Sequence, residues 1–425
     1  MGGVVSALLK DVPIPRMVKV RQVFPRPRIE PEQIPETIHN LLAEEKFASR
    51  IQPGMRVCIT AGSRGIANIV SITKVLADFC KERGASPFVV PAMGSHGGAT
   101  AEGQREVLAA LGVTEQAVGC PILSSMETVE IGVTEEGHHV RIDRFAASAD
   151  AIIVSCRIKA HTGFRGPYES GIMKMMAIGL GKQEGAEMCH EAGIKHMARL
   201  VPMFGRTIRD HAPVVFALAT IENAFDETAK IVALTAEEFD EWEPVYLKEA
   251  FRNMPKLLFG SCDVLIVDKI GKNISGDGMD PNVTGTFATP YASGGIKAQR
   301  VCVLGLTEES HHSGVGMGMA DASTKRLLSQ VDLEMSYPNA ITSTVLEPVK
   351  IPPILDNDRE AIQICIRTAN EIDKNNPRII RIANTLELEH ILISEAMLEE
   401  ARTHSDIIIE SDPFEMEFNE EGNLW

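Results

Sequence analysis

Short runs of apolar, often β-branched residues alternate along the chain with longer segments whose apolar residues recur every three or four positions. Residues 56–61 ("RVCITA") read as a buried strand, and helical spacing follows from Ile66 until Gly84 ends the predicted helix. Further strands are predicted at 87–92 ("PFVVPA") and 151–158 ("AIIVSCRI"). This alternation is typical of βα units on a mainly parallel sheet.

The same pattern continues in the second half of the chain. Strands are predicted at 214–220, 263–270 and 300–306, and helices near 236–252, 318–329 and 358–375. Thr100 is placed to N-cap a helix that runs to about Leu111. We therefore predict an α/β protein with two α/β domains, mainly parallel sheets and an active site in the crevice between the domains.

The boundary between these domains is expected at 253–262, where a charged helix gives way to a new strand. This divides the chain into an N-terminal cofactor-binding catalytic domain, residues 1–255, and a C-terminal substrate-covering domain, residues 256–404. The tail, residues 405–425, is strand-like and can return to the first domain.

Composition narrows the class of protein. The 425 residues are 44% hydrophobic and 24% charged, as in ordinary globular proteins. The net charge of −16, with no basic block, argues against a nucleic-acid partner. Eight scattered cysteines without a CxxC pair suit a reducing compartment, so we expect a cytoplasmic protein. No apolar run approaches the ~18 to 20 residues of a membrane span, and no signal peptide is visible, so no membrane partner is expected.

Three reactive side chains follow the first three predicted strands. Arg64 lies in "TAGSRG", His96 in "GSHGG" and His161 in "KAHTG". Ligands of parallel sheets bind outside the carboxyl ends of the strands, so these side chains are expected to converge. Any one of them alone is more often a plain solvated or hydrogen-bonding residue, but their equivalent positions favour a shared catalytic site.

Other candidates lie farther along. Lys174 sits between "SGIM" and "MMAIGLG", and a desolvated lysine there can hold a cofactor covalently. The alternative is a helical lysine whose stem packs past methionines. Taken alone, His190 reads as a surface helix histidine. Lys272 lies in a glycine-rich loop of the second domain that either faces substrate or only forms turns.

Taken together, "GSHGGATAEGQREVL", "KAHTG", "ESGIMKMMAIGLG" and His190 resemble the lactate racemase family that uses the nickel-pincer nucleotide. The resemblance covers residues 50–200, and beyond them it rests on length and two-domain layout. It implies a pyridinium-3-thioamide-5-thiocarboxylic acid mononucleotide tethered to Lys174, with Ser170 and Gly171 in the cofactor site. Nickel would be held by two sulfurs, a ring carbon and His190.

The resemblance also implies an isomerase mechanism. His96 and His161 correspond to the acid/base histidines and Arg64 to the arginine that binds the substrate carboxylate. Direct deprotonation at C2 of a 2-hydroxy acid is hard because that C–H is weakly acidic, whereas hydride removal leaves a planar keto acid. One histidine takes the hydroxyl proton, and the other gives a proton after hydride returns to the opposite face. The expected partners are a small 2-hydroxy acid and the enzymes that assemble the cofactor.

Two departures from the family pattern bear on the substrate. Ala61 stands where the family commonly has an aspartate three residues before the arginine. The segment from His161 to Lys174 is longer than in the lactate enzymes, through "FRGPYE". Both departures favour a 2-hydroxy acid larger than lactate, such as a sugar acid, or a related polyol.

Two other classes of function remain open from the residues alone. One is a zinc-dependent hydrolase built on His96, His161 and His190, although catalytic zinc sites usually contain a short-spaced ligand pair and a carboxylate base. The other is a non-catalytic protein that binds a small molecule at the same strand ends.

Overall fold

Two compact units make up the chain in the computed structural model, which describes residues 3–63 and 65–425. One unit spans Arg26–Met254, and is called the 26–254 unit below. The other combines the N-terminal segment as far as Pro25 with Pro255–Trp425, and is called the terminal unit. Each has its own sheet, so each is an α/β unit as predicted.

The 26–254 unit is built on a five-stranded sheet in the order β3-β2-β6-β7-β8. The first four strands are parallel, and β8 is antiparallel to β7. The strands are β2 (Arg56–Ala61), β3 (Ser86–Pro91), β6 (Ala151–Arg157), β7 (Val214–Glu222) and β8 (Thr228–Thr235). A separate antiparallel hairpin consists of β4 (Thr128–Val133) and β5 (His139–Asp143).

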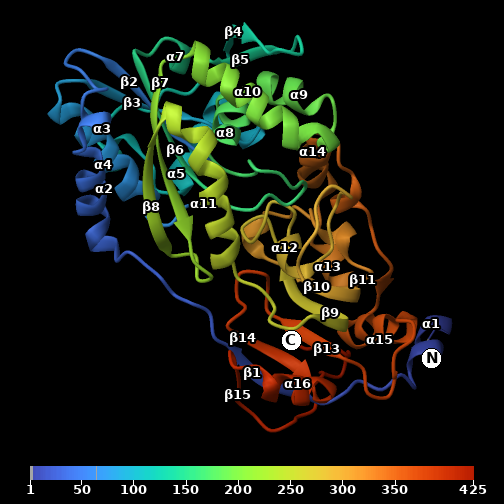
Figure 1. The fold of residues 1–425 in the computed structure, drawn as a ribbon. Helices are drawn as coiled ribbons and strands as arrows, with labels where there is room; N and C mark the ends of the chain where they lie inside the picture. The colour runs from blue at the N-terminus through green and yellow to red at the C-terminus, as the bar shows by residue number, and fades with distance from the viewer. Residues whose placement is uncertain (1–2, 64) are drawn as a thin grey trace. The chain divides into compact units, whose positions relative to one another are not determined.

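Helices cover both faces of this sheet, as Figure 1 shows. One face packs against α2 (Ile34–Leu42) and α4 (Ile69–Glu82). The opposite face packs against α8 (Ile172–Lys174), a π-helix (Met175–Leu180), α10 (Met197–His211) and α11 (Phe239–Asn253). The π-helix leads into α9 (Lys182–His190), and the shorter helices are α3 (Glu45–Ala48), α5 (Ala101–Ala110), α6 (Glu115–Val118) and α7 (Arg144–Ala147).

The apolar strand sequences follow from this arrangement. Val57 and Ile59 belong to the core on the α4 face, whereas Cys58 between them belongs to the core on the opposite face. A strand buried on both faces reads as a continuous apolar run, which is the pattern that predicted it. The predicted helix stop near Gly84 is confirmed, and Thr100 caps α5 by accepting the N–H of Gly103 at 3.0 Å.

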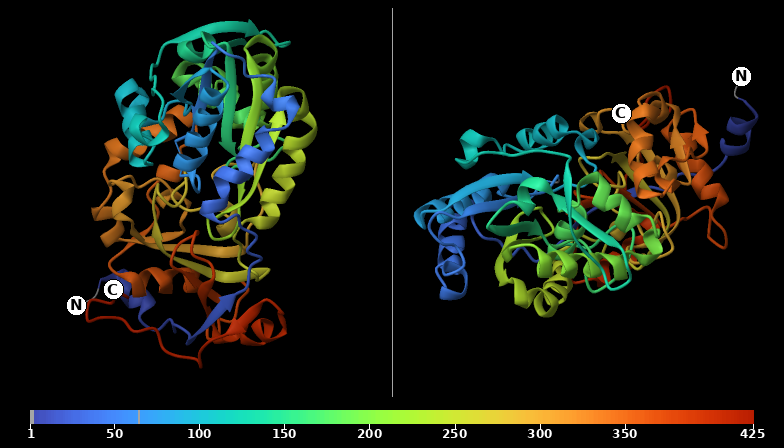
Figure 2. Two further views of the ribbon diagram at one scale, coloured as in Figure 1. Left: turned by 90° about the vertical axis from the view of Figure 1, so that its left-hand side faces the viewer. Right: turned by 90° about the horizontal axis from the view of Figure 1, so that it is seen from above.

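The terminal unit contains an eight-stranded mixed sheet in the order β12-β11-β10-β9-β13-β14-β1-β15. Both chain ends belong to this unit (Figure 2). Its strands are β1 (Met17–Gln22), β9 (Ser261–Ile270), β10 (Lys297–Leu306), β11 (Ala322–Thr324), β12 (Ile354–Leu355), β13 (Ile379–Ile382), β14 (His390–Ser394) and β15 (Ile407–Ile409). Its helices are α1 (Val4–Leu9), α12 (Pro281–Thr284), α13 (Lys325–Ser329), α14 (Leu333–Ser343), α15 (Asp358–Thr368) and α16 (Leu398–Thr403).

The division of the chain differs from the expected domains 1–255 and 256–404 at both termini. The first 25 residues belong to the terminal unit, because β1 pairs with β14 and with β15 there. The tail, residues 405–425, also stays in the terminal unit through β15 instead of returning to the first domain. An apolar pattern predicts a strand, but it carries no information on which sheet the strand joins.

Two predicted helices are shorter in the structure than their patterns suggested. The helix expected at 318–329 is α-helical only in α13; a short 3-10 helix (Met317–Met319) and the strand β11, which pairs with β10 and β12, come before it. The helix expected at 358–375 ends at Thr368. Throughout residues 3–63 and 65–425, no helix is long and apolar enough to cross a lipid bilayer.

Candidate active site

The carboxyl ends of three neighbouring parallel strands form one edge of the five-stranded sheet. Ala61 at the end of β2 is in register with Pro91 at the end of β3, and β6 lies on the other side of β2. His96 follows β3 and His161 follows β6, so both loops open at the same edge, as predicted. Arg64 follows β2 but lies outside the described residues.

His96 is half-buried and is held by its neighbours on the β2 and β3 loops. Its ring Nδ1 forms a hydrogen bond with the hydroxyl of Ser63, from the loop after β2. The buried side chain of Gln104 on α5 donates to the backbone carbonyls of Gly94 and His96, at 2.8 and 3.2 Å. The loop therefore has a fixed path, and its histidine has a hydroxyl partner.

His161 lies in a short loop that is closed by antiparallel hydrogen bonds between Lys159 and Ser170. Glu169, whose side chain is almost fully buried, accepts the backbone N–H of His161 at 2.8 Å. This carboxylate lies in the stretch "FRGPYE" that lengthens the segment before Lys174.

The ring of His161 is also fixed. Its Nδ1 accepts the backbone N–H of Gly163 at 2.9 Å, and the ring lies 4.3 Å, centroid to centroid, from that of Phe164. Burial, followed by the positive charge of Lys174, holds the pKa of His161 well below its usual value, and His190 also contributes to this shift when it is protonated. The imidazole is therefore neutral, and these two side chains lie within electrostatic reach of it.

Lys174 sits where α8 passes into the π-helix, a rare conformation that often marks functional sites. The side chain is half-buried. The π-helix packs closely on the β3 loop: Gly179 accepts the N–H of Gly94 at 3.2 Å, and a Cβ on Gly179 would lie 2.7 Å from the carbonyl oxygen of Ala92. Glycine at 179 therefore allows the lysine segment to approach the loop of His96.

A buried lysine side chain links the end of the π-helix to the end of β3. Lys182, at the start of α9, is fully buried and donates to the carbonyl of Pro91 at the end of β3 and to Gln104, at 2.5 and 2.9 Å. Its ammonium also lies 3.3 Å from the buried carboxylate of Asp143. The sequence did not single out either residue.

His190 ends α9 and is half-buried. Its Nδ1 donates a hydrogen bond to the carbonyl of Ala186 at 2.8 Å, which leaves the lone pair on Nε2. Burial, and then the charge of Lys174, lowers the pKa of this imidazole, so the neutral form prevails. A neutral imidazole with its other nitrogen bonded to a carbonyl is the usual form of a metal-ligating histidine.

A buried carboxyl group supports the start of this lysine segment. Glu243 on α11 accepts the N–H of Met173 at 3.1 Å, and a Cβ on Gly171 would lie 2.2 Å from its Oε1. Burial raises the pKa of Glu243 to about 8, so its carboxyl group is largely protonated at neutral pH. Ser170 and Gly171, the residues predicted beside the cofactor, lie at this junction.

The raised pKa predicts a pH-dependent stability. The folded protein holds the Glu243 proton that the unfolded chain releases near its ordinary value, so the free energy of unfolding falls as pH rises towards about 8. The limiting slope is about 1.4 kcal/mol per pH unit. Urea unfolding between pH 6 and 9 should show a weaker decline in Glu243→Gln than in wild type. Glu241→Gln, an exposed position on the same helix, should behave as wild type, and equal slopes in all three proteins would contradict the assignment.

Lys272, the predicted substrate contact, lies in the terminal unit, in the loop after β9. Its ammonium donates to the carbonyl of Gly276 in its own loop at 3.0 Å. This loop adjoins the one after β10, where Thr307 donates to Asn273 at 2.7 Å. Lys272 therefore also lies at the carboxyl end of a parallel strand, and its contact with substrate stays a prediction.

The described side chains form no group of three histidine, cysteine, aspartate or glutamate residues that could hold a metal ion. A zinc site made by His96, His161 and His190, one of the alternatives above, thus has no support in that part of the chain. A metal complex in which a bound nucleotide supplies most of the ligand atoms needs only one histidine from the protein. The Nε2 lone pair of His190 is suited to that role.

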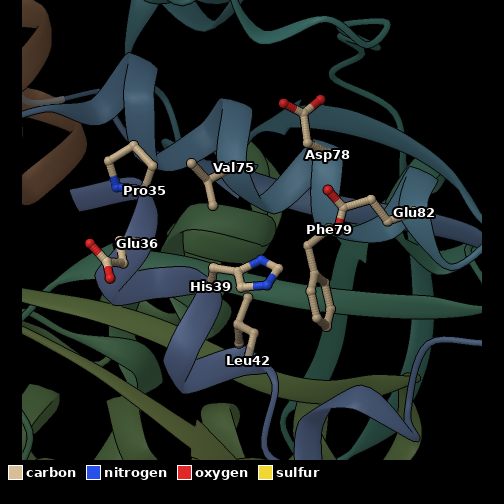
Figure 3. Close-up of a pocket in the computed structure, with 8 residues that line it drawn as sticks. All are labelled: Pro35, Glu36, His39, Leu42, Val75, Asp78, Phe79 and Glu82. Atoms are coloured by element: carbon tan, nitrogen blue, oxygen red, sulfur yellow. The ribbon is translucent and has the colours of Figure 1, made fainter. Parts of the chain in front are cut away.

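A surface hollow lies elsewhere in the 26–254 unit (Figure 3). It sits between α2 and α4, which cover one face of the sheet, and not at the carboxyl ends of the strands. Its lining residues are Pro35, Glu36, His39, Leu42, Val75, Asp78, Phe79 and Glu82. None of the candidate catalytic side chains contributes to it.

Comparison with known proteins shows a sequence similarity over the part of the chain that contains the candidate site. Residues 4–200, which include His96, His161, Lys174 and His190, match the family model of the lactate racemase N-terminal domain. No curated protein matches the chain by sequence.

Two solved structures share the fold. The lactate racemase apoprotein from Thermoanaerobacterium thermosaccharolyticum has a TM-score of 0.50 at 11% identity, covering 88% of this chain and 99% of that chain. A structural-genomics protein from Thermotoga maritima has a TM-score of 0.51 at 12% identity, covering 86% and 99%. Residues 4–200 are therefore similar to the lactate racemase N-terminal domain, and the chain shares its fold with these two structures.

Proposed function

We propose that this protein is a racemase or epimerase that inverts C2 of a 2-hydroxy acid by hydride transfer. The observation that carries the proposal is the set of three side chains Lys174, His161 and His190, whose two imidazoles are fixed by hydrogen bonds of Nδ1 to the backbone. Burial, and then the charge of Lys174, lowers the pKa of both imidazoles. All three residues lie within the part of the chain that matches the lactate racemase N-terminal domain.

The proposed cofactor is a nickel-pincer nucleotide joined to Lys174, with Ser170 and Gly171 beside it and His190 as the nickel ligand. The residues present fit this group. Lys174 is partly shielded from solvent in an apolar segment, and the Nε2 lone pair of His190 is left for a metal by the hydrogen bond of Nδ1 to Ala186. When bound, the cofactor would supply the acceptor for the hydride of C2.

In this proposal the residues of the chain handle the proton and the orientation of the substrate. His96 and His161, at the carboxyl ends of β3 and β6 on either side of β2, bind the C2 hydroxyl and between them handle its proton. Arg64 is proposed to grip the substrate carboxylate through two parallel hydrogen bonds, which a planar guanidinium provides and an ammonium does not. Ala61 in place of the family's aspartate removes a hydrogen-bond acceptor and a negative charge, and we propose that the site therefore takes a substrate larger than lactate.

The proposal is tested with protein that has been co-produced with cofactor-assembly enzymes. Single enantiomers of lactate, larger 2-hydroxy acids, sugar acids and polyols are incubated with it and analysed by chiral chromatography. We expect inversion at C2 of an acid larger than lactate and a strong loss in Arg64→Lys. Inversion of polyols alone would remove the carboxylate role of Arg64, and hydrolysis without inversion would favour a different class of enzyme.

A further inference from the structure

The loop between Lys159 and Ser170 fixes the backbone of His161 on both sides. Glu169 accepts the N–H of His161 at 2.8 Å, and Arg165 donates to its carbonyl oxygen at 2.7 Å. Glu169 and Arg165 are themselves paired at 3.2 Å, with the carboxylate almost fully buried. The backbone position of His161 is therefore set by a charged pair within its own loop.

The same loop fixes the proton on the ring. A backbone N–H can only donate, so the 2.9 Å contact from Gly163 makes Nδ1 of His161 an acceptor with its lone pair facing the amide. A neutral imidazole then carries its hydrogen on Nε2. In this state Nε2 of His161 is able to donate a hydrogen bond but has no lone pair with which to accept a proton.

His96 is held differently. The partner of its Nδ1 is the hydroxyl of Ser63, and a hydroxyl can donate or accept. Rotation of that hydroxyl lets the hydrogen of His96 reside on either nitrogen. Nε2 of His96 can therefore take a proton and return it, with Ser63 adjusting at each step.

We propose that the two histidines are unequal: His96 carries the hydroxyl proton in both halves of the reaction, whereas His161 is a fixed hydrogen-bond donor to the oxygen on C2. This assignment rests on the proposed function. In the first half, Nε2 of His96 takes the proton of the C2 hydroxyl, and the electron pair of the broken O–H bond forms the C=O bond. The cofactor, when bound, would accept the C2 hydrogen together with its electron pair. In the second half, hydride returns to the other face of the keto acid and His96 returns the proton. His161 stays neutral throughout and polarises the carbonyl through Nε2–H.

The tautomer can be measured without turnover. In full-length protein with isotope-labelled histidine, two-bond proton–nitrogen correlation at neutral pH distinguishes Nε2–H from Nδ1–H, and the signal lost in His161→Gln assigns His161. We expect His161 to be neutral with hydrogen on Nε2. His139→Gln, on the exposed hairpin, serves as the assignment control. A hydrogen on Nδ1, or an imidazolium, would overturn the proposal.

The division of roles is tested by a single turnover of each enantiomer on cofactor-loaded protein, followed by acid quench and measurement of the keto acid. His161→Gln keeps an N–H donor but cannot act as a base, so we expect keto acid from both enantiomers. His161→Leu should form much less from both, and His96→Gln, which is also unable to accept a proton, should form almost none. Keto acid from only one enantiomer in His161→Gln would show that His161 is a base and overturn the proposal.

Different results would overturn the proposed function and the unequal roles of the two histidines. If loaded wild-type protein forms keto acid from no hydroxy acid, the proposed function fails, and with it the assignment of the proton carrier. The tautomer of His161 is then still decided by the resonance measurement. If wild type turns over but the tautomer is Nδ1–H, only the inequality of the two histidines fails.

Discussion

Replacing Lys174 with alanine is expected to abolish the covalent attachment of the cofactor completely. The proposed tether is a bond to the side-chain nitrogen, and alanine offers no atom to make it. Protein co-produced with cofactor-assembly enzymes should show an added mass by intact-mass spectrometry in wild type, located on the peptide that contains Lys174, and none in Lys174→Ala.

The control for this result is Lys195→Ala, an exposed lysine of the same unit. It should carry the same adduct as wild type. An unmodified wild-type protein, or an adduct that survives in Lys174→Ala, would remove the tether from the account. Because Glu243 and the glycine at 179 position this segment, folding of each variant is checked by its unfolding midpoint before the masses are compared.

The second large effect is expected at His96. His96→Ala should lower turnover by about 10²- to 10⁴-fold, the range for loss of a general acid–base group, while the adduct on Lys174 remains. Ser63→Ala should cost less, because it leaves the imidazole in place and removes only its Nδ1 partner. Turnover is measured by chiral chromatography at saturating substrate.

An exposed histidine of the same unit provides the comparison. His39→Ala, in the hollow between α2 and α4, should keep wild-type activity. Near-normal turnover in His96→Ala would take His96 out of the mechanism, and loss of the adduct in that variant would show a role in cofactor loading instead.

Most helices and strands could be predicted from the sequence, but the pairing of the strands could be predicted only in part. Strands buried on both faces of a sheet, such as β2 and β6, appear in the sequence as continuous apolar runs. The prediction of a parallel sheet with loops at one edge rests on these runs. β1 and β15 belong to the sheet of the terminal unit through contacts between the two ends of the chain. The three-residue strand β11 was predicted as helix, because its apolar residues are too few to show a period.

The residues of the candidate site could likewise be predicted only in part. Histidines and a lysine among glycines after strands can be read from the sequence, as His96, His161 and Lys174 were. The residues that position these side chains, such as Glu169, cannot be identified from the sequence, because a buried carboxylate has the same sequence signature as an acid on the surface. Glu243 supports a segment some seventy positions earlier in the chain, and only the fold brings them together.

If C2 is inverted by hydride transfer at this site, the hydrogen on C2 does not exchange with solvent during the reaction, and its fate can be followed with deuterium. Cofactor-loaded protein is incubated in deuterated water with one enantiomer of the acid that it inverts, and the product enantiomer is isolated and analysed for deuterium. Hydride transfer moves the C2 hydrogen without exposing it as a proton, so the account predicts an inverted product that keeps protium at C2. Deuterium at C2 of the inverted product would show deprotonation and contradict the account.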